Sequence, residues 1–169
     1  MATITLKGNP IHTSGSLSPI GSQAPDFVLV DAALNDVTLA TYAGKKKLLN
    51  IVPSLDTPVC AMSTRRFSTA VKDHPQAVFL MVSADLPFAM SRFCKAEETE
   101  NVIPLSLMRS RDFARDYGVL IEDGPLAGIT ARAVIVLDTA DRVIYSSCPR
   151  SPTNRTTSWL WPRCADEAQ

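Results

Sequence analysis

The chain has 169 residues, 46% of them hydrophobic, which suits one well-buried domain and leaves little room for two. Its 17 basic and 17 acidic residues cancel, so its charge favours neither a nucleic-acid nor an anionic-membrane partner. No apolar run approaches the roughly 20 residues that cross a bilayer, and the first residues lack the pattern of a secretion signal. These features predict a soluble, cytoplasmic protein.

Turn residues divide the first part of the chain into short elements. Gly8, Asn9 and Pro10 separate two strand patterns, which predicts an N-terminal β-hairpin. The predicted elements here are hairpin strands over Thr3–Leu6 and Ile11–Thr13, short strands over Phe27–Val30 and Val37–Leu39, and a helical turn over Leu39–Tyr42.

Longer apolar strand patterns then alternate with helical ones. The predicted strands are Lys47–Val52, Val78–Ser83, Val102–Leu107, Ala131–Leu137 and Arg142–Tyr145, and the predicted helices are Val59–Asp73, Pro87–Ala96 and Arg111–Tyr117. Strands that alternate with helices indicate a sheet covered on both faces, and a closing hairpin makes that sheet mixed. The pattern predicts an α/β protein of thioredoxin-like fold, with a central mixed sheet flanked by helices.

Cysteine is the residue type with the most chemical potential in this chain. The four cysteines form neither a C-x-x-C pair nor a zinc-type cluster with His12 or His74, and they are Cys60, Cys94, Cys148 and Cys164. The glycines are dispersed and form no phosphate-binding loop. We therefore expect no metal and no bound cofactor, and thiols that are free or catalytic rather than structural disulfides.

Cys60 is the first candidate nucleophile because of its predicted position. It follows a buried strand and the loop Pro53–Val59, at the start of a predicted helix. The unpaired N–H groups and partial positive charge there favour the reactive thiolate. A small buried hydrophobe is the alternative interpretation for any single cysteine. Thr57 has two compatible roles, since its hydroxyl can face the sulfur or a bound oxygen, or cap the helix.

Pro53, Thr57 and Cys60 match the P-x-x-x-T-x-x-C signature of peroxiredoxins, and further strings resemble the bacterial thiol peroxidases, the atypical two-cysteine branch of that family. The supporting strings are residues 7–10, 48–57, 83–89, 91–94, 123–126 and 131–134, and the similarity runs from about residue 4 to Tyr145. The resemblance implies a peroxidase that reduces hydrogen peroxide and alkyl hydroperoxides, with residues 1–145 as its domain.

The resemblance also assigns roles to individual residues. It implies that Cys60 forms a sulfenic acid, that Cys94 resolves it as an intrachain disulfide, and that thioredoxin reduces this disulfide. It makes Arg132 the active-site cation, and it implies a homodimer. Pro53, with its fixed φ and no backbone N–H, would either shield the site or simply end the strand before it. Taken alone, Cys94 reads as a core-facing helix residue and Arg132 as an exposed charge at a strand end. Because a disulfide needs Cα atoms about 5.5 Å apart, we expect the segments around both cysteines to unwind on oxidation.

Residues 146–169 depart from the family, which ends in an amphipathic helix. This segment instead crowds arginine, proline, tryptophan and cysteine. One permitted set of codons for Cys148–Asp166, when translated from one nucleotide earlier, encodes a peptide that resembles the C-terminal end of the family and then a stop codon. We therefore interpret the tail as the product of a frameshift, without a catalytic role. Two further hypotheses stay open, namely a redox sensor or disulfide carrier without significant turnover, and an inactive product destabilised by the tail.

Overall fold

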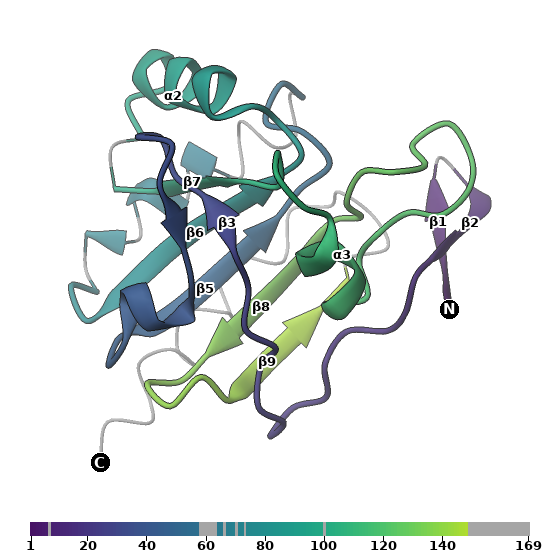
Figure 1. Ribbon diagram of the computed structural model, residues 1–169, viewed down its shortest axis with the longest axis horizontal. Helices are drawn as coiled ribbons and strands as arrows, with labels where there is room; N and C mark the ends of the chain where they lie inside the picture. The colour runs from purple at the N-terminus through teal and green to yellow at the C-terminus, as the bar shows by residue number, and fades with distance from the viewer. Residues whose placement is uncertain are drawn as a thin grey trace.

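The computed structural model describes residues 1–6, 8–57, 64–65, 67–69, 71–72, 74–99 and 101–148. Within these residues the elements follow one another in the predicted order (Figure 1). They are β1 (Ala2–Leu6), β2 (Asn9–Thr13), β3 (Leu29–Val30), β4 (Asp36–Val37), the 3₁₀ helix η1 (Leu39–Tyr42), β5 (Lys46–Ile51), β6 (Ala77–Ser83), α2 (Pro87–Ala96), β7 (Ile103–Ser106), α3 (Asp112–Asp116), β8 (Ala133–Leu137) and β9 (Val143–Ser147).

The main sheet has seven strands in the order β4-β3-β7-β6-β5-β8-β9. The three central strands β7, β6 and β5 run parallel, whereas β3, β4, β8 and β9 pair antiparallel, so the sheet is mixed as predicted. Strand β5 lies between β6 and β8 in the interior of the sheet and is buried at every residue. Leu48, Leu49 and Ile51 are apolar, as a strand covered on both faces requires. Its buried polar side chains have partners, since Lys47 bonds to Asp141 and Asn50 to the sulfur of Met81.

Helices α2 and α3 pack on opposite faces of this sheet. Side chains alternate along a strand, so Leu49 and Ile51 share one hydrophobic core with Phe113 of α3. Leu48 belongs to the second core, together with Met90 of α2. The prediction of a central sheet flanked by helices is confirmed, and Figure 1 shows the two helices well separated.

The N-terminal hairpin is confirmed as a separate two-stranded antiparallel sheet, and it projects from one side of the molecule in Figure 1. Glu122 donates its backbone N–H to the carbonyl of His12 at 2.9 Å. The His12 ring nitrogen Nδ1 lies 2.5 Å from Asp123 Oδ2. These contacts hold the hairpin to the loop before β8, and the bond to His12 keeps the pKa of Asp123 below its usual value.

Several predicted boundaries shift for identifiable reasons. The predicted strand over residues 27–30 shortens to β3 because the Phe27 amide donates to the Asp26 carboxylate. The same carboxylate accepts the Leu39 amide at 3.1 Å, where the predicted strand gives way to η1. Strand β9 continues to Ser147, two residues beyond the predicted end.

Most of the predicted helix over Val59–Asp73 lies outside the described residues. Those that are described within it are helical at Thr64, Arg65, Phe67–Thr69 and Val71. Among the helices of the described part of the chain, none is long and apolar enough to cross a bilayer.

Candidate active site

The carboxyl ends of the three parallel strands bring polar residues to one edge of the sheet. Ser54 follows β5, Ser83 ends β6 and Ser106 ends β7. Because these strands run in the same direction, the three serines meet at the same edge. In open α/β sheets this edge is where ligands bind.

The Pro53–Thr57 segment forms a compact turn at this edge. Pro53 and Thr57 are both half-buried. The Asp56 amide donates to Ser54 Oγ at 3.1 Å, and Thr57 Oγ1 points back toward the Ser54 carbonyl at 3.5 Å. Thr57 thus sits in a defined place relative to the sheet, while Cys60, three residues further on, lies outside the described residues.

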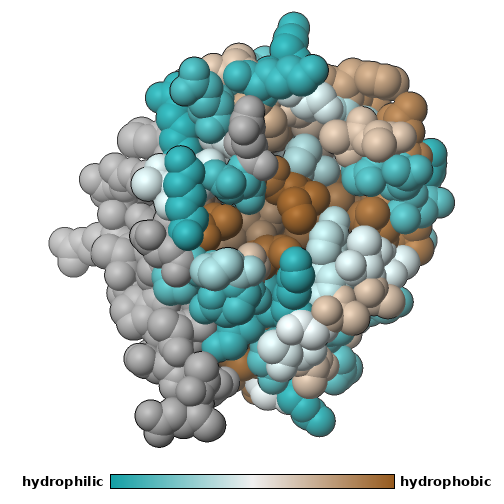
Figure 2. Space-filling view, turned by 90° about the vertical axis from the view of Figure 1, so that its left-hand side faces the viewer, coloured by the Kyte–Doolittle hydropathy of each residue, from teal (hydrophilic) through white to brown (hydrophobic). Residues whose placement is uncertain are grey.

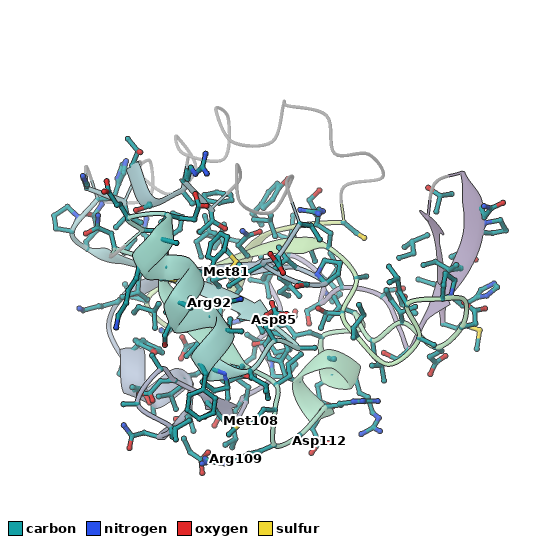
Figure 3. The ribbon with its side chains drawn as sticks, turned by 90° about the horizontal axis from the view of Figure 1, so that it is seen from above. Met81, Asp85, Arg92, Met108, Arg109 and Asp112 are labelled. Atoms are coloured by element: carbon teal, nitrogen blue, oxygen red, sulfur yellow. The ribbon has the colours of Figure 1, made fainter. Side chains whose placement is uncertain are left out.

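Asp85, in the connection between β6 and α2, fixes this turn. Its Oδ1 accepts the Ser54 hydroxyl at 2.8 Å. Its Oδ2 accepts the Leu55 amide at 2.7 Å and the Ser83 hydroxyl at 2.8 Å. In Figure 3, Asp85 lies inward of α2, whereas Arg109 and Asp112 lie at the periphery of the molecule.

Arg132 lies next to the same edge because β8 runs antiparallel beside β5. Ile51 pairs with Ala133, so Arg132 stands at the level where β5 passes into the turn. The buried Thr130 hydroxyl donates to the Val52 carbonyl at 2.7 Å and ties the two segments together. The Arg132 side chain is half-buried, and its own carbonyl accepts the Cys148 thiol at 3.2 Å.

Cys94 lies in the second half of α2 as a free, half-buried thiol. Burial raises its pKa, and the neighbouring Thr99 hydroxyl offsets this only in part. It is seven residues after Pro87, where the helix begins, which places it about 10 Å along the helix axis at 1.5 Å per residue. Cys94 is therefore displaced from the edge that carries Pro53, Thr57 and the backbone of Arg132.

Sequence reasoning missed the residues that hold the site together, above all Asp85 and Thr130. Asp85 lies within residues 83–89, which pointed only to a family resemblance. A usable signal was present, since serines or aspartates directly after successive buried strands mark the edge where parallel strands end. Which of them bond to one another depends on the strand order, and the sequence alone does not give that order. Cys164, for which the sequence analysis expects no catalytic role, lies outside the described residues.

The fold and the site together define a protein of the thioredoxin-like class. The sheet is mixed with helices on both faces, and a half-buried turn from Pro53 to Thr57 lies beside Arg132 at the ends of the parallel strands. A Redoxin family model matches residues 19–159. A thiol peroxidase of Mycobacterium tuberculosis is 50% identical over 146 residues, which covers 86% of this chain and 87% of that protein, and one of Mycobacterium bovis matches equally well.

Solved structures agree with this match. A peroxiredoxin-like protein from Aquifex aeolicus has a TM-score of 0.89 at 34% identity, covering 96% of this chain and 95% of its own. Thiol peroxidase from Chromobacterium violaceum has a TM-score of 0.82 at 27% identity, covering 88% of each chain. The chain therefore belongs to the Redoxin family, and it is an enzyme of the thiol peroxidase and peroxiredoxin group within it.

Proposed function

We propose that this enzyme reduces hydrogen peroxide and organic hydroperoxides through Cys60. The Cys60 thiolate attacks one peroxide oxygen, the O–O bond breaks, and that oxygen remains on sulfur as a sulfenic acid. The other oxygen takes a proton and leaves as water or an alcohol. The Cys94 thiol then condenses with the sulfenic acid, releasing water and forming the Cys60–Cys94 disulfide. Thioredoxin dithiol reduces this disulfide and is itself oxidised.

The observation that carries this proposal is the meeting of the Pro53–Thr57 turn and the Arg132 segment at one edge. The Thr130–Val52 hydrogen bond and the pairing of Ile51 with Ala133 support it. A guanidinium here stabilises a thiolate and polarises a peroxide, and each pKa unit of such stabilisation corresponds to about 1.4 kcal/mol. Thr57 supplies a hydroxyl, and Pro53 adds an apolar ring and no backbone N–H, so the turn can bind a peroxide while limiting access of water.

Cys94 suits the resolving role better than the attacking one. Its raised pKa keeps the thiol protonated near neutral pH, whereas the attacking group must be a thiolate. Its place in the second half of α2 sets it back from the active edge. A disulfide with Cys60 therefore requires local unwinding, since Cα atoms joined by a disulfide lie about 5.5 Å apart.

The proposed partners are thioredoxin and a second copy of the chain. Leu86 and Phe88, beside Asp85, are 54% and 66% exposed, and Met108 is 38% exposed. On the face shown in Figure 2, apolar side chains line a hollow bordered by hydrophilic ones. Exposed apolar surface of this kind favours a homodimer. We place the protein in the cytoplasm, where thioredoxin keeps thiols reduced.

Peroxide-dependent oxidation of NADPH, coupled through thioredoxin and thioredoxin reductase, tests the proposal. We expect turnover in the wild type, none in Cys60→Ser, and a trapped sulfenic acid without turnover in Cys94→Ser. Cys148→Ser is the matched control, because Cys148 is also a half-buried cysteine and serine keeps a donor for the Arg132 carbonyl, and it should keep wild-type turnover. Full activity in Cys60→Ser would refute the site.

Two other results of this assay would support the two alternative hypotheses, a redox sensor or carrier and an inactive product. A wild type that forms a sulfenic acid without thioredoxin-linked turnover is a sensor or carrier, and an unfolded wild type without Cys60 oxidation is an inactive product.

We further propose that residues 1–145 form the catalytic domain and that the tail from Ser146 arises from a frameshift. Ser146 and Ser147 still pair with Ile135 and Val134 as the end of β9, and the residues after Cys148 lie outside the described part of the chain. Sequencing the gene across the Tyr145 codon tests the frameshift. An unambiguous in-frame read with unrelated codons would disprove it.

A further inference from the structure

We infer that Asp85 is a positioning residue for the peroxide-reducing step, one that holds the Pro53–Thr57 turn in its reactive conformation. This inference rests on the proposed function of that turn. Asp85 lies too far along the chain from Cys60 for sequence to connect them, and no motif of catalytic residues includes it.

The Asp85 carboxylate joins two strand ends. It accepts the Ser54 hydroxyl and the Leu55 amide from the turn after β5, and the Ser83 hydroxyl from the end of β6. Leu55 and Ser83 are almost completely buried, so these donors have little access to water in exchange. A carboxylate is well suited here because it only accepts hydrogen bonds, and every group facing it donates.

The Asp85 backbone joins a third strand end to the same network. The buried Ser106 hydroxyl, at the end of β7, donates to the Asp85 carbonyl at 2.5 Å. The Asp85 amide donates to Ser83 Oγ at 3.1 Å. One residue thus connects the ends of β5, β6 and β7, and its own position relative to the sheet is fixed from two sides.

Ser54 connects the Asp85 carboxylate to Thr57. Ser54 receives the Asp56 amide on its hydroxyl and faces the Thr57 hydroxyl with its carbonyl. A shift of Ser54 therefore moves Thr57 and the chain that leads to Cys60. Misplacement of reacting groups by about 1 Å lowers enzymatic rates about 100-fold.

Asp85 also stands two residues before Pro87, the first residue of α2. The same anchor thereby holds the turn that leads to Cys60 and the start of the helix that carries Cys94. Unwinding after oxidation can then proceed on either side of a fixed point.

The test compares Asp85→Ala and Asp85→Asn with the control Asp56→Asn. Asp56 carries the same charge in the same turn, but its side chain is exposed. Two rates are measured on each protein at 25 °C, namely oxidation of Cys60 by hydrogen peroxide and alkylation of Cys60 by iodoacetamide. The first rate depends on peroxide positioning and the second chiefly on the thiolate.

We expect Asp85→Ala to lower the peroxide rate at least 10-fold while the alkylation rate changes less than 3-fold. Asp85→Asn, which keeps one acceptor oxygen, should recover much of the peroxide rate, and Asp56→Asn should match the wild type. Ser54→Ala in the Asp85→Asn background should add less than it does alone, because both changes break the same contact.

Three outcomes would overturn the inference. These are an Asp85→Ala peroxide rate within 2-fold of wild type, an equal fall in both rates, or an equal loss in Asp56→Asn. If Asp85→Ala does not fold, Asp85→Asn and Ser54→Ala decide the same question through the ratio of the two rates. A wild type that peroxide does not oxidise at Cys60 refutes the proposed function instead.

Discussion

The buried hydrogen bond from Thr130 to the Val52 carbonyl gives the sharpest prediction about the scaffold of the site. Both residues are fully buried, and the donor and acceptor lie 2.7 Å apart. Thr130→Val replaces the hydroxyl with a methyl group of nearly the same size, so it removes the bond without opening a cavity. Leaving a buried acceptor without this donor costs about 1–3 kcal/mol. At about 2–4 °C per kcal/mol for a chain of this length, the middle of that range lowers Tm by roughly 4–8 °C.

Thermal and urea unfolding, followed by circular dichroism, measure this effect. Thr130→Ser is the discriminating control, because it keeps the hydroxyl and loses the methyl group. If the hydrogen bond dominates, Thr130→Val is the less stable variant, and if packing dominates, Thr130→Ser is. A Thr130→Val protein as stable as the wild type, or more stable than Thr130→Ser, would refute the reasoning.

Three further predictions concern charges and thiols elsewhere in the described chain. Because burial raises the pKa of Cys94, this thiol should be alkylated more slowly at pH 7 than an ordinary cysteine, and its rate should still be rising with pH where an ordinary thiol, of pKa about 8.5, has levelled off. Stability should fall as pH rises past the unfolded pKa of about 8.5, because only the unfolded chain then loses this proton readily. Mass spectrometry of alkylated peptides checks the rate, and rapid labelling at pH 7 would contradict the prediction. Lys47 is fully buried and its Nζ lies 2.5 Å from Asp141 Oδ1. Asp141→Asn leaves this buried ammonium without its charge partner and should destabilise the fold by about 3–5 kcal/mol. Lys47→Met should cost clearly less, because it removes the buried charge and the Asp141 side chain left behind is 23% exposed. Urea unfolding of both variants tests this, and equal losses would argue against an unpaired buried charge as the cause. The pKa of Asp123 is lowered by its bond to His12, so the contact is complete above about pH 4 and is lost as pH falls through the lower folded pKa. Protection of the His12 amide against exchange, taken relative to its intrinsic rate at each pH, should then fall in the wild type, and Asp123→Asn should lack this pH dependence.

Local patterns in the sequence were enough to predict most of the helices and strands of the described residues. The helix Pro87–Ala96 was predicted at its observed bounds, because Pro87 suits the first turn and the residues before it are extended. The strands β6 and β8 were recognisable because strands buried on both faces are almost continuously apolar, and β5 was recognisable from its apolar residues Leu48, Leu49 and Ile51. Prediction failed where a side chain competes with the local pattern: the Asp26 carboxylate accepts the amides of Phe27 and Leu39, so β3 begins later and β4 ends earlier than predicted.

In the candidate site, too, local features were predicted from the sequence and long-range contacts were not. Pro53, Thr57 and Cys60 were identified from sequence because their spacing is local, and Arg132 and Cys94 from a resemblance. Their mutual placement was not accessible in that way, and the position of Cys60 stays a prediction.

By itself, the sequence determined the chemistry of the residues and the order of the elements, because residue spacing and apolar periodicity are properties of neighbouring positions. Only the tertiary structure decided that β5, β6 and β7 end together, that β8 brings Arg132 beside the turn, and that Asp85 joins three strand ends. The physical reason is that hydrogen bonds between residues 21, 30 and 31 positions apart depend on strand order and register, which arise from packing the whole sheet.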